Sequence, residues 1–298
     1  MIAEQNTKYV WIVPLVFIAL LHPVDAKPAP DVPADAQRVL AAFVHPLDQD
    51  RISHPEGGTR LVEIYTASWC PVCAEAERAL DRLFNESIDA QDSMTLLAYH
   101  PWPDRSDPLG FAEGDARMTE RFGAVAFPTI WVDGMWKDSA ATRPMDVSEG
   151  LEEVFYQSLQ NMLGWANDVP RDLTALTEVG PSSEQGLAIT VTSSSSLAGP
   201  LVVTPVLWED PVQHNERVHR LVARGTLEPH TILKVEADAP IRLTWNLGTE
   251  PAEGRLGVTI IVEEAPRRET ATVPAVSVVS VLGALVSAAV LTAALRRA

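Results

Sequence analysis

Residues 61–73, Leu-Val-Glu-Ile-Tyr-Thr-Ala-Ser-Trp-Cys-Pro-Val-Cys, contain both cysteines of this 298-residue chain, Cys70 and Cys73. The apolar run at residues 61–65 predicts a strand, and the apolar spacing that follows predicts an amphipathic helix from Cys70 to Asn85. The two thiols are therefore expected in the first turn of a helix, where unpaired N–H groups and the positive end of the helix dipole favour a thiolate. We interpret this layout as a dithiol/disulfide redox site.

The chain around this stretch alternates strands and helices. Residues 34–44 carry apolar side chains at helical spacing, and residues 46–58 are polar and irregular. After the cysteines we expect a strand at 94–99, a Pro-rich loop at 100–109, a helix at 114–122, strands at 125–132 and 135–137, and a helix at 147–165. Asp133-Gly134 between two strand-like runs predicts a hairpin. The order predicts an α/β domain over residues 59–166, with helices on both faces of a small sheet, after a linker and leading helix at residues 27–58.

Residues 171–266 show a different pattern. Alternating apolar positions predict strands at 187–192, 201–208, 219–226, 232–237, 241–246 and 256–262. Turn residues separate these strands at close intervals, and no helical period occurs among them. We therefore expect a separate antiparallel β-sandwich, immunoglobulin-like in type, that serves as a spacer or docking module.

Both ends of the chain are hydrophobic. Residues 1–26 have the layout of a secretory signal peptide, with an apolar run at 9–21 and a small-residue boundary ending at Ala26. That run is too short to span a bilayer comfortably, and an uncleaved signal anchor is the alternative. Residues 273–295 are uncharged and long enough to cross a membrane, which predicts a transmembrane anchor with a cytoplasmic tail at 296–298. A buried helix of a soluble domain and a sorting tail clipped after export are the alternatives.

The formal net charge of −17 argues against a nucleic-acid partner, since no basic stripe exists to neutralise phosphates. Together with the two hydrophobic ends it indicates an acidic body outside the cytoplasm, periplasmic or extracellular, attached to the cell membrane by a single pass. A disulfide that closes so short a loop removes little chain entropy, which disfavours a purely structural role. Because zinc requires four ligands and no second Cys/His pair has suitable spacing, we expect no metal and no cofactor beyond the reversible disulfide.

Two motifs within residues 35–165 resemble the thioredoxin superfamily. Trp69-Cys70-Pro71-Val72-Cys73 resembles its active-site motif, and Ala126-Phe127-Pro128-Thr129 resembles the segment that carries its cis-proline. Residues 62–70, Leu97-Ala98-Tyr99-His100 and Val132-Asp133-Gly134 are also similar to secreted thioredoxin-like proteins of poorly assigned function, which carry a long loop after the Tyr-His pair and a β-rich C-terminal part. The resemblance implies a thioredoxin-like domain with protein-disulfide oxidoreductase activity on protein thiols and disulfides.

The resemblance also implies roles for individual residues. Cys70 is the nucleophile and Cys73 the resolving thiol. Pro128 is a cis-proline that faces the dithiol and exposes backbone groups to a substrate chain, the alternative being an ordinary trans-proline that opens a strand. Glu63 is a buried acid that relays a proton to Cys73, a match that requires a one-residue gap; the alternative is a solvated or ion-paired glutamate on an edge strand. Residues expected to bind substrate are Trp69, Phe127 and Thr129.

His100 and Trp102 follow the end of a strand, where open α/β sheets present their sites, and we expect them to form a rim that selects substrates. Two other classes of function remain open. One is a copper-delivery protein that uses Cys70, Cys73 and His100 as ligands for a soft metal. The other is a binding module whose thioredoxin fold is redox-inert.

Two arginines and three histidines are interpreted as lying outside the site. Arg117 and Arg121 are expected to pair with acidic neighbours, and His214, His219 and His230 to be ordinary surface residues. The direction of electron flow is open. An oxidase or isomerase needs a membrane partner that regenerates the disulfide. A reductase needs electrons delivered across the membrane, because the chain contains no further cysteine to relay them.

Overall fold

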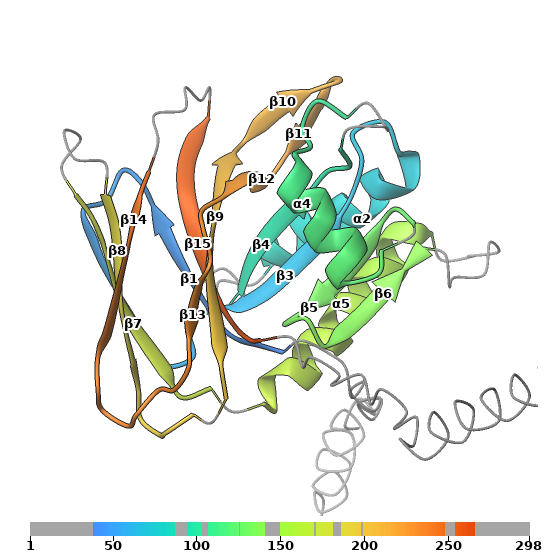
Figure 1. Cartoon of the computed structure of the whole chain (residues 1–298). Helices are drawn as coiled ribbons and strands as arrows, with labels where there is room; N and C mark the ends of the chain where they lie inside the picture. Colours follow the sequence, from blue (N-terminus) through green and yellow to red (C-terminus); the bar gives the residue numbers. More distant parts are fainter. Residues whose placement is uncertain are drawn as a thin grey trace, which may run out of the picture. The chain divides into compact units, whose positions relative to one another are not determined.

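A computed structural model describes residues 38–86, 94–102, 107–124, 126–140, 150–169, 171–180, 186–197, 199–247 and 254–265 (Figure 1). The expected signal peptide and C-terminal span lie outside these residues. Within the described ranges, no helix combines the length and the apolar character needed to cross a bilayer. All of the described residues belong to one compact unit of the chain.

One mixed sheet contains strands from the N-terminal half of that unit, up to α5 (Leu151–Asn167), and from the C-terminal half, from β7 (Leu173–Val179) onward. Its order is β1-β15-β9-β12-β4-β3-β5-β6, with β13 paired to β9. Its strands are β1 (Val39–Pro46), β3 (Arg60–Tyr65), β4 (Met94–Tyr99), β5 (Thr129–Val132), β6 (Trp136–Ser139), β9 (Leu201–Asp210), β12 (Val222–Thr226), β13 (His230–Ile232) and β15 (Arg255–Glu264). The halves join where β12 pairs in parallel with β4 at Val222 and Ala98, and the Ala98 amide donates to the Leu221 carbonyl at 3.0 Å. The two segments expected to be separate domains therefore share a sheet, and the expectation of separateness is corrected.

Residues 39–44 form a strand, so the helix expected at residues 34–44 is wrong over its described part. β1 pairs antiparallel with β15, and apolar side chains are buried on both of its faces. Leu40 and Phe43 belong to one core and Val39 and Ala42 to another. A strand that is buried on both faces has a continuous apolar sequence. Such a sequence also contains apolar residues at helical spacing, which is why a helix was predicted here.

A second sheet packs face to face with the C-terminal part of the first and forms a sandwich (Figure 1). Its order is β14-β8-β7-β2, and its strands are β2 (Arg51–His54), β7 (Leu173–Val179), β8 (Gly186–Ser193) and β14 (Ile241–Asn246). Leu173, Ile189 and Val191 from this sheet meet Val203 and Ile260 from the other. β2 comes from the stretch expected to be irregular, and β7 from a stretch where no strand was predicted. The sandwich is therefore built from both ends of the described chain.

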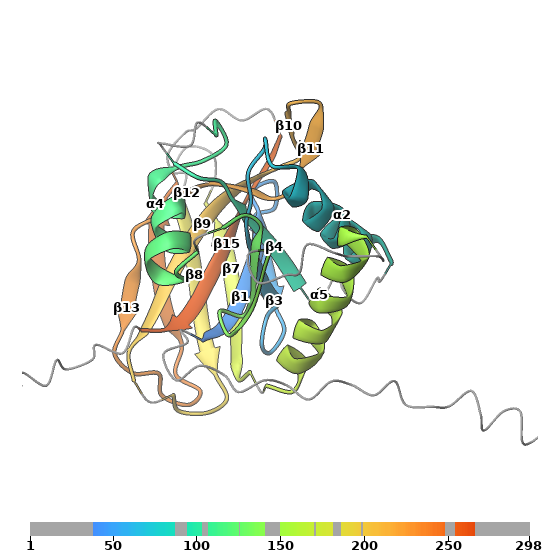
Figure 2. The same ribbon diagram turned by 90° about the vertical axis from the view of Figure 1, so that its right-hand side faces the viewer.

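Helices cover both faces of the N-terminal part of the mixed sheet, as predicted (Figure 2). On one face α2 (Pro71–Glu86) and α5 (Leu151–Asn167) pack on Val62 and Ile64 of β3. On the other, α4 (Ala112–Ala116) continues into the π-helical turn η1 (Arg117–Arg121), which packs on Leu61 and Tyr65. This alternation along β3 decides on which face of the sheet each site residue lies.

The hairpin predicted at Asp133-Gly134 is confirmed, because β5 and β6 pair on either side of it. Both turn residues have positive φ (51° and 67°), as tight hairpin turns require. The Asp133 carboxylate is buried and accepts a hydrogen bond from the Leu61 amide at 2.9 Å. It also pairs with Arg60 at 3.1 Å and with Arg171, which follows α5. The turn residue therefore anchors the segment that leads into the sandwich.

Candidate functional site

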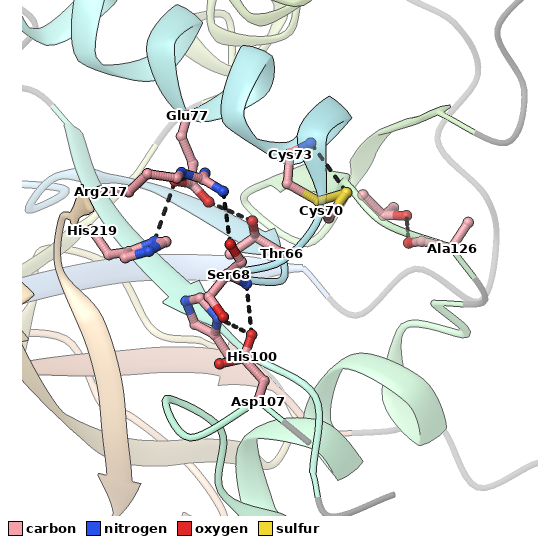
Figure 3. The surroundings of a disulfide bond; sticks show 11 residues. Thr66, Ser68, Cys70, Cys73, Glu77, His100, Asp107, Ala126, Arg217 and His219 are labelled. Atoms are coloured by element: carbon pink, nitrogen blue, oxygen red, sulfur yellow. Dashed lines mark hydrogen bonds and ion pairs between the residues drawn. A yellow bond between two sulfur atoms is a disulfide. The ribbon is translucent and has the colours of Figure 1, made fainter. Parts of the chain in front are cut away.

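Cys70 and Cys73 are joined by a disulfide at the start of α2, with a Cα–Cα separation of 5.2 Å, within the range usual for disulfides (Figure 3). Cys70 directly precedes the helix, and its carbonyl accepts a hydrogen bond from the Ala74 amide. Pro71, which has no N–H, occupies the first helical position. The Cys73 amide donates to the Cys70 sulfur at 3.2 Å. Cys70 is 8% exposed and Cys73 is fully buried, so Cys70 is the cysteine with surface open to solvent.

Two of the residues expected to bind substrate lie together beside the disulfide. Trp69 is 51% exposed, and its ring meets Phe127 edge to face at 5.8 Å between centroids. Phe127 packs in turn on Tyr65 and against the core formed by Ala67 and the two cysteines. Trp69 and Phe127 therefore offer an apolar surface next to Cys70. Trp102 is also exposed and lies on the loop after β4.

The peptide bond between Phe127 and Pro128 is cis, as the resemblance implies. Pro128 and Thr129 are buried at the start of β5. The Thr129 hydroxyl donates to the Ala126 carbonyl at 2.7 Å and lies 3.0 Å from the Ser139 hydroxyl. Since these contacts occupy the buried side chain, Thr129 holds the turn before β5 rather than presenting its hydroxyl to a substrate. That part of the prediction is corrected.

Glu63 does not face the disulfide. It alternates with Val62 and Ile64, which face α2, and its carboxylate therefore lies on the other side of the sheet. There its Oε1 accepts from Arg117 Nε at 2.5 Å and its Oε2 from Arg117 Nη2 at 3.1 Å. Arg117 also bonds Glu263 of β15 at 3.3 Å. The expected proton relay from Glu63 to Cys73 is therefore corrected to a buried ion pair.

The pairing expected for the two arginines is confirmed. Arg121 joins the same network by pairing with Glu263, so both cations of η1 bind carboxylates of the sheet. The network links β3, η1 and β15, and thereby ties the two halves of the chain together.

His100 is fully buried and is not a rim residue, which corrects that prediction. Its Nδ1 lies 3.0 Å from Asp107 Oδ2, and burial lowers the pKa of the His100 imidazole. Asp107 also accepts hydrogen bonds from the amides of Ser68 (2.6 Å) and Leu109 (3.1 Å). Burial alone would raise the pKa of Asp107, but the contacts with His100 and these amides hold it well below its usual value. The pair fastens the loop after β4 to the turn before Cys70.

A hairpin from the C-terminal half completes the site and was not expected from the sequence. β10 (Val212–His214) and β11 (Arg217–His219) form a two-stranded sheet beside the start of α2 (Figures 2 and 3). Arg217 donates from Nη1 to the Ser68 carbonyl at 3.0 Å and from Nη2 to Glu77 Oε2 at 2.7 Å. Thr66 donates to the other oxygen of Glu77 at 2.6 Å. Arg217 thus connects the turn before the cysteines with the helix after them.

His219, the last residue of β11, is buried, so its interpretation as a surface residue is wrong. Its ring meets that of His100 edge to face at 5.4 Å, and its Nδ1 lies 3.3 Å from Glu77 Oε2. Burial would raise the pKa of Glu77, but the contacts with His219 and Thr66 and the charge of Arg217 lower it. Glu77 is therefore a carboxylate at neutral pH. The sequence signal was the alternation of Arg217 and His219, which places both on one face of β11.

In the described ranges, no three His, Cys, Asp or Glu side chains are arranged to hold a metal ion. Cys70, Cys73 and His100, the ligands named for the copper alternative, do not form such a group in the disulfide-bonded protein. The contacts that the structure gives His100 are with Asp107 and His219.

No family model matches this chain, and no curated protein is significantly similar to it.

Proposed function

We propose that this protein is a membrane-anchored, extracytoplasmic thiol–disulfide oxidoreductase in which Cys70 and Cys73 alternate between a disulfide and a dithiol. The observation that carries the proposal is the disulfide at the first turn of α2, in which Cys70 is slightly exposed and Cys73 is fully buried. A thiolate at Cys70 gains from the helix dipole and from the Cys73 amide, which already donates to that sulfur.

The exchange reaction needs no group beyond the two thiols. The Cys70 thiolate attacks a substrate disulfide, forms a mixed disulfide and releases one substrate thiolate. The Cys73 thiol then gives up its proton, which a released substrate thiolate takes up, and attacks Cys70 Sγ, which releases the second substrate thiolate and restores the disulfide. The reverse sequence oxidises a substrate dithiol. The difference in reduction potential between the protein and its partners sets the direction.

The surface beside Cys70 suits a polypeptide substrate. Trp69 is half-exposed and rests on Phe127, and aromatic anchors of this kind supply contact area at low cost in side-chain entropy. A chain bound there brings its own sulfur to Cys70. We propose that a membrane redox partner restores the active form, because the sequence contains only the two cysteines that react with the substrate. The proposed anchor at residues 273–295 places that partner in or near the membrane.

The trapping experiment tests the proposal. Cys73→Ser retains the nucleophile and removes the resolving thiol, so the full-length variant should accumulate mixed disulfides with cellular proteins that a reductant releases. Cys70→Ser is the matched control and should accumulate none, since the remaining sulfur is buried. If both variants stay free of mixed disulfides while the wild type is expressed and exported, catalysis on protein substrates is refuted.

A further inference from the structure

The ion pair between Arg217 and Glu77 crosses from the C-terminal half of the chain to the helix that carries the disulfide (Figure 3). It is largely shielded from water, since the side chains are 26% and 17% exposed. Opposite charges in such a place interact more strongly than on an open surface. Removing one charge of the pair therefore leaves the other unbalanced in a partly shielded place.

Glu77 lies close to the disulfide along the chain, and Arg217 contacts a residue that does. Glu77 is four residues after Cys73 on α2, and side chains at this spacing share one face of a helix. Arg217 also binds the carbonyl of Ser68, two residues before Cys70. The guanidinium thus contacts segments on both sides of the Cys-Pro-Val-Cys motif.

The other groups that face Glu77 come from three elements. Thr66 reaches it from the end of β3 and His219 from β11. Asp81 lies one further turn along α2, and its own pKa is raised by burial and by the charge of Glu77. Among these neighbours Arg217 is the permanent cation, and its charge compensates the carboxylate alongside the contacts with Thr66 and His219.

We propose that Arg217 and Glu77 act in opposite directions on the reduction potential of the Cys70–Cys73 disulfide, with Arg217, a positioning residue supplied by the β10–β11 hairpin, offsetting the effect of the Glu77 carboxylate. The inference rests on the proposed function. Reduction consumes two electrons and one proton and converts the neutral disulfide into one thiolate and one thiol. A nearby cation stabilises the thiolate and raises the potential, whereas a nearby carboxylate lowers it. The intact pair leaves these two effects nearly balanced.

Removing Arg217 should therefore shift the reduction potential in one direction, and removing Glu77 should shift it in the other. Arg217→Met leaves the Glu77 carboxylate uncompensated and disfavours the thiolate. Glu77→Gln leaves the guanidinium uncompensated and favours it. Together the two changes should largely cancel.

The test uses the full-length protein in detergent, equilibrated with mixtures of reduced and oxidised glutathione. Arg217→Met should make the dithiol about tenfold harder to form, which equals about 30 mV for a two-electron couple, and Glu77→Gln about tenfold easier. The double variant should fall within about threefold of the wild type. The ultraviolet absorbance of the thiolate should titrate at higher pH in Arg217→Met and at lower pH in Glu77→Gln.

Two further variants distinguish an effect of charge on the potential from a purely structural effect. Arg220→Met removes a cation from the residue after β11, where it pairs with Asp210, and should leave the equilibrium unchanged. Arg217→Lys retains the charge and should behave more like the wild type than Arg217→Met does. If Arg217→Met does not fold, Glu77→Gln and Arg217→Lys decide the question.

The outcomes separate the two proposals. Shifts of the same sign in Arg217→Met and Glu77→Gln, or shifts no larger than that of Arg220→Met, overturn the role of the ion pair. A wild-type disulfide that glutathione does not reduce overturns the proposed function instead.

Discussion

Replacing Glu63 by Gln tests whether this carboxylate acts in the redox reaction or in the fold. The two side chains of the Glu63–Arg117 pair are 1% and 8% exposed, and two hydrogen bonds of 2.5 and 3.1 Å join them. Breaking a buried ion pair on one side costs about 3–5 kcal/mol. Gln keeps one acceptor oxygen, and Arg117 keeps its bond to Glu263 at 3.3 Å. We therefore expect Glu63→Gln to lower the free energy of unfolding by about 2–3 kcal/mol.

Denaturant unfolding and glutathione equilibration on the same samples provide the measurement. The unfolding midpoint should fall, while the equilibrium between disulfide and dithiol should remain at the wild-type value. Glu178→Gln is the matched control, because this carboxylate pairs with Arg242 at the surface and its loss should change little. The reasoning is refuted if Glu63→Gln unfolds like the wild type but slows the resolving step or shifts the glutathione equilibrium, since that is the behaviour of a proton relay.

Three further predictions concern pH, packing and substrate binding. Burial and the charge of His45 lower the pKa of His54 to about 4. As the pH falls, His54 therefore takes up its proton in the unfolded state before it does so in the folded state. The free energy of unfolding should fall by about 2 kcal/mol between pH 6.5 and pH 4. Urea titrations at the two pH values should show a smaller loss in His54→Gln. A Cβ at Gly257 would lie 2.0 Å from the Trp208 ring, so Gly257→Ala should lower the unfolding midpoint by an amount equivalent to about 1–3 kcal/mol; an unchanged midpoint would contradict this packing. Trp69→Ala should slow reduction of a disulfide-bonded protein about tenfold and leave reduction of oxidised glutathione nearly unchanged, and equal effects on both would remove its role in binding.

Local patterns in the sequence predicted the elements that carry the disulfide. The strand at 61–65, the helix after Cys70 and the hairpin at Asp133-Gly134 depend on residues close together in the chain, and the structure contains all three. The strand expected at 241–246 coincides with β14. Such elements are predictable because hydrophobic period and turn chemistry are read within a few residues.

Long-range pairing was not predictable in the same way. The join between β4 and β12 brings together residues more than a hundred positions apart, and no local pattern marks it. The strand β1 carries apolar residues on both faces, which removes the alternation that would have distinguished it from a helix.

The same limit explains why the sequence did not indicate two residues of the site. Arg217 and His219 reach α2 through a hairpin from the other half of the chain, so their role depends on tertiary placement. For Glu63 the sequence indicated burial on a strand but not which face of the sheet it occupies. The choice between a relay and an ion pair depends on that face, and Arg117 on η1 settles it.

Graded reduction of the full-length, folded protein with alkylation of the freed thiols tests the proposed chemistry most directly. Cys70 and Cys73 should pass reversibly between disulfide and dithiol as the glutathione ratio changes, with Cys70 alkylated first because it is the more exposed residue of the two. A disulfide that persists in the folded protein at every glutathione ratio, or one in which Cys73 reacts before Cys70, would contradict a catalytic role.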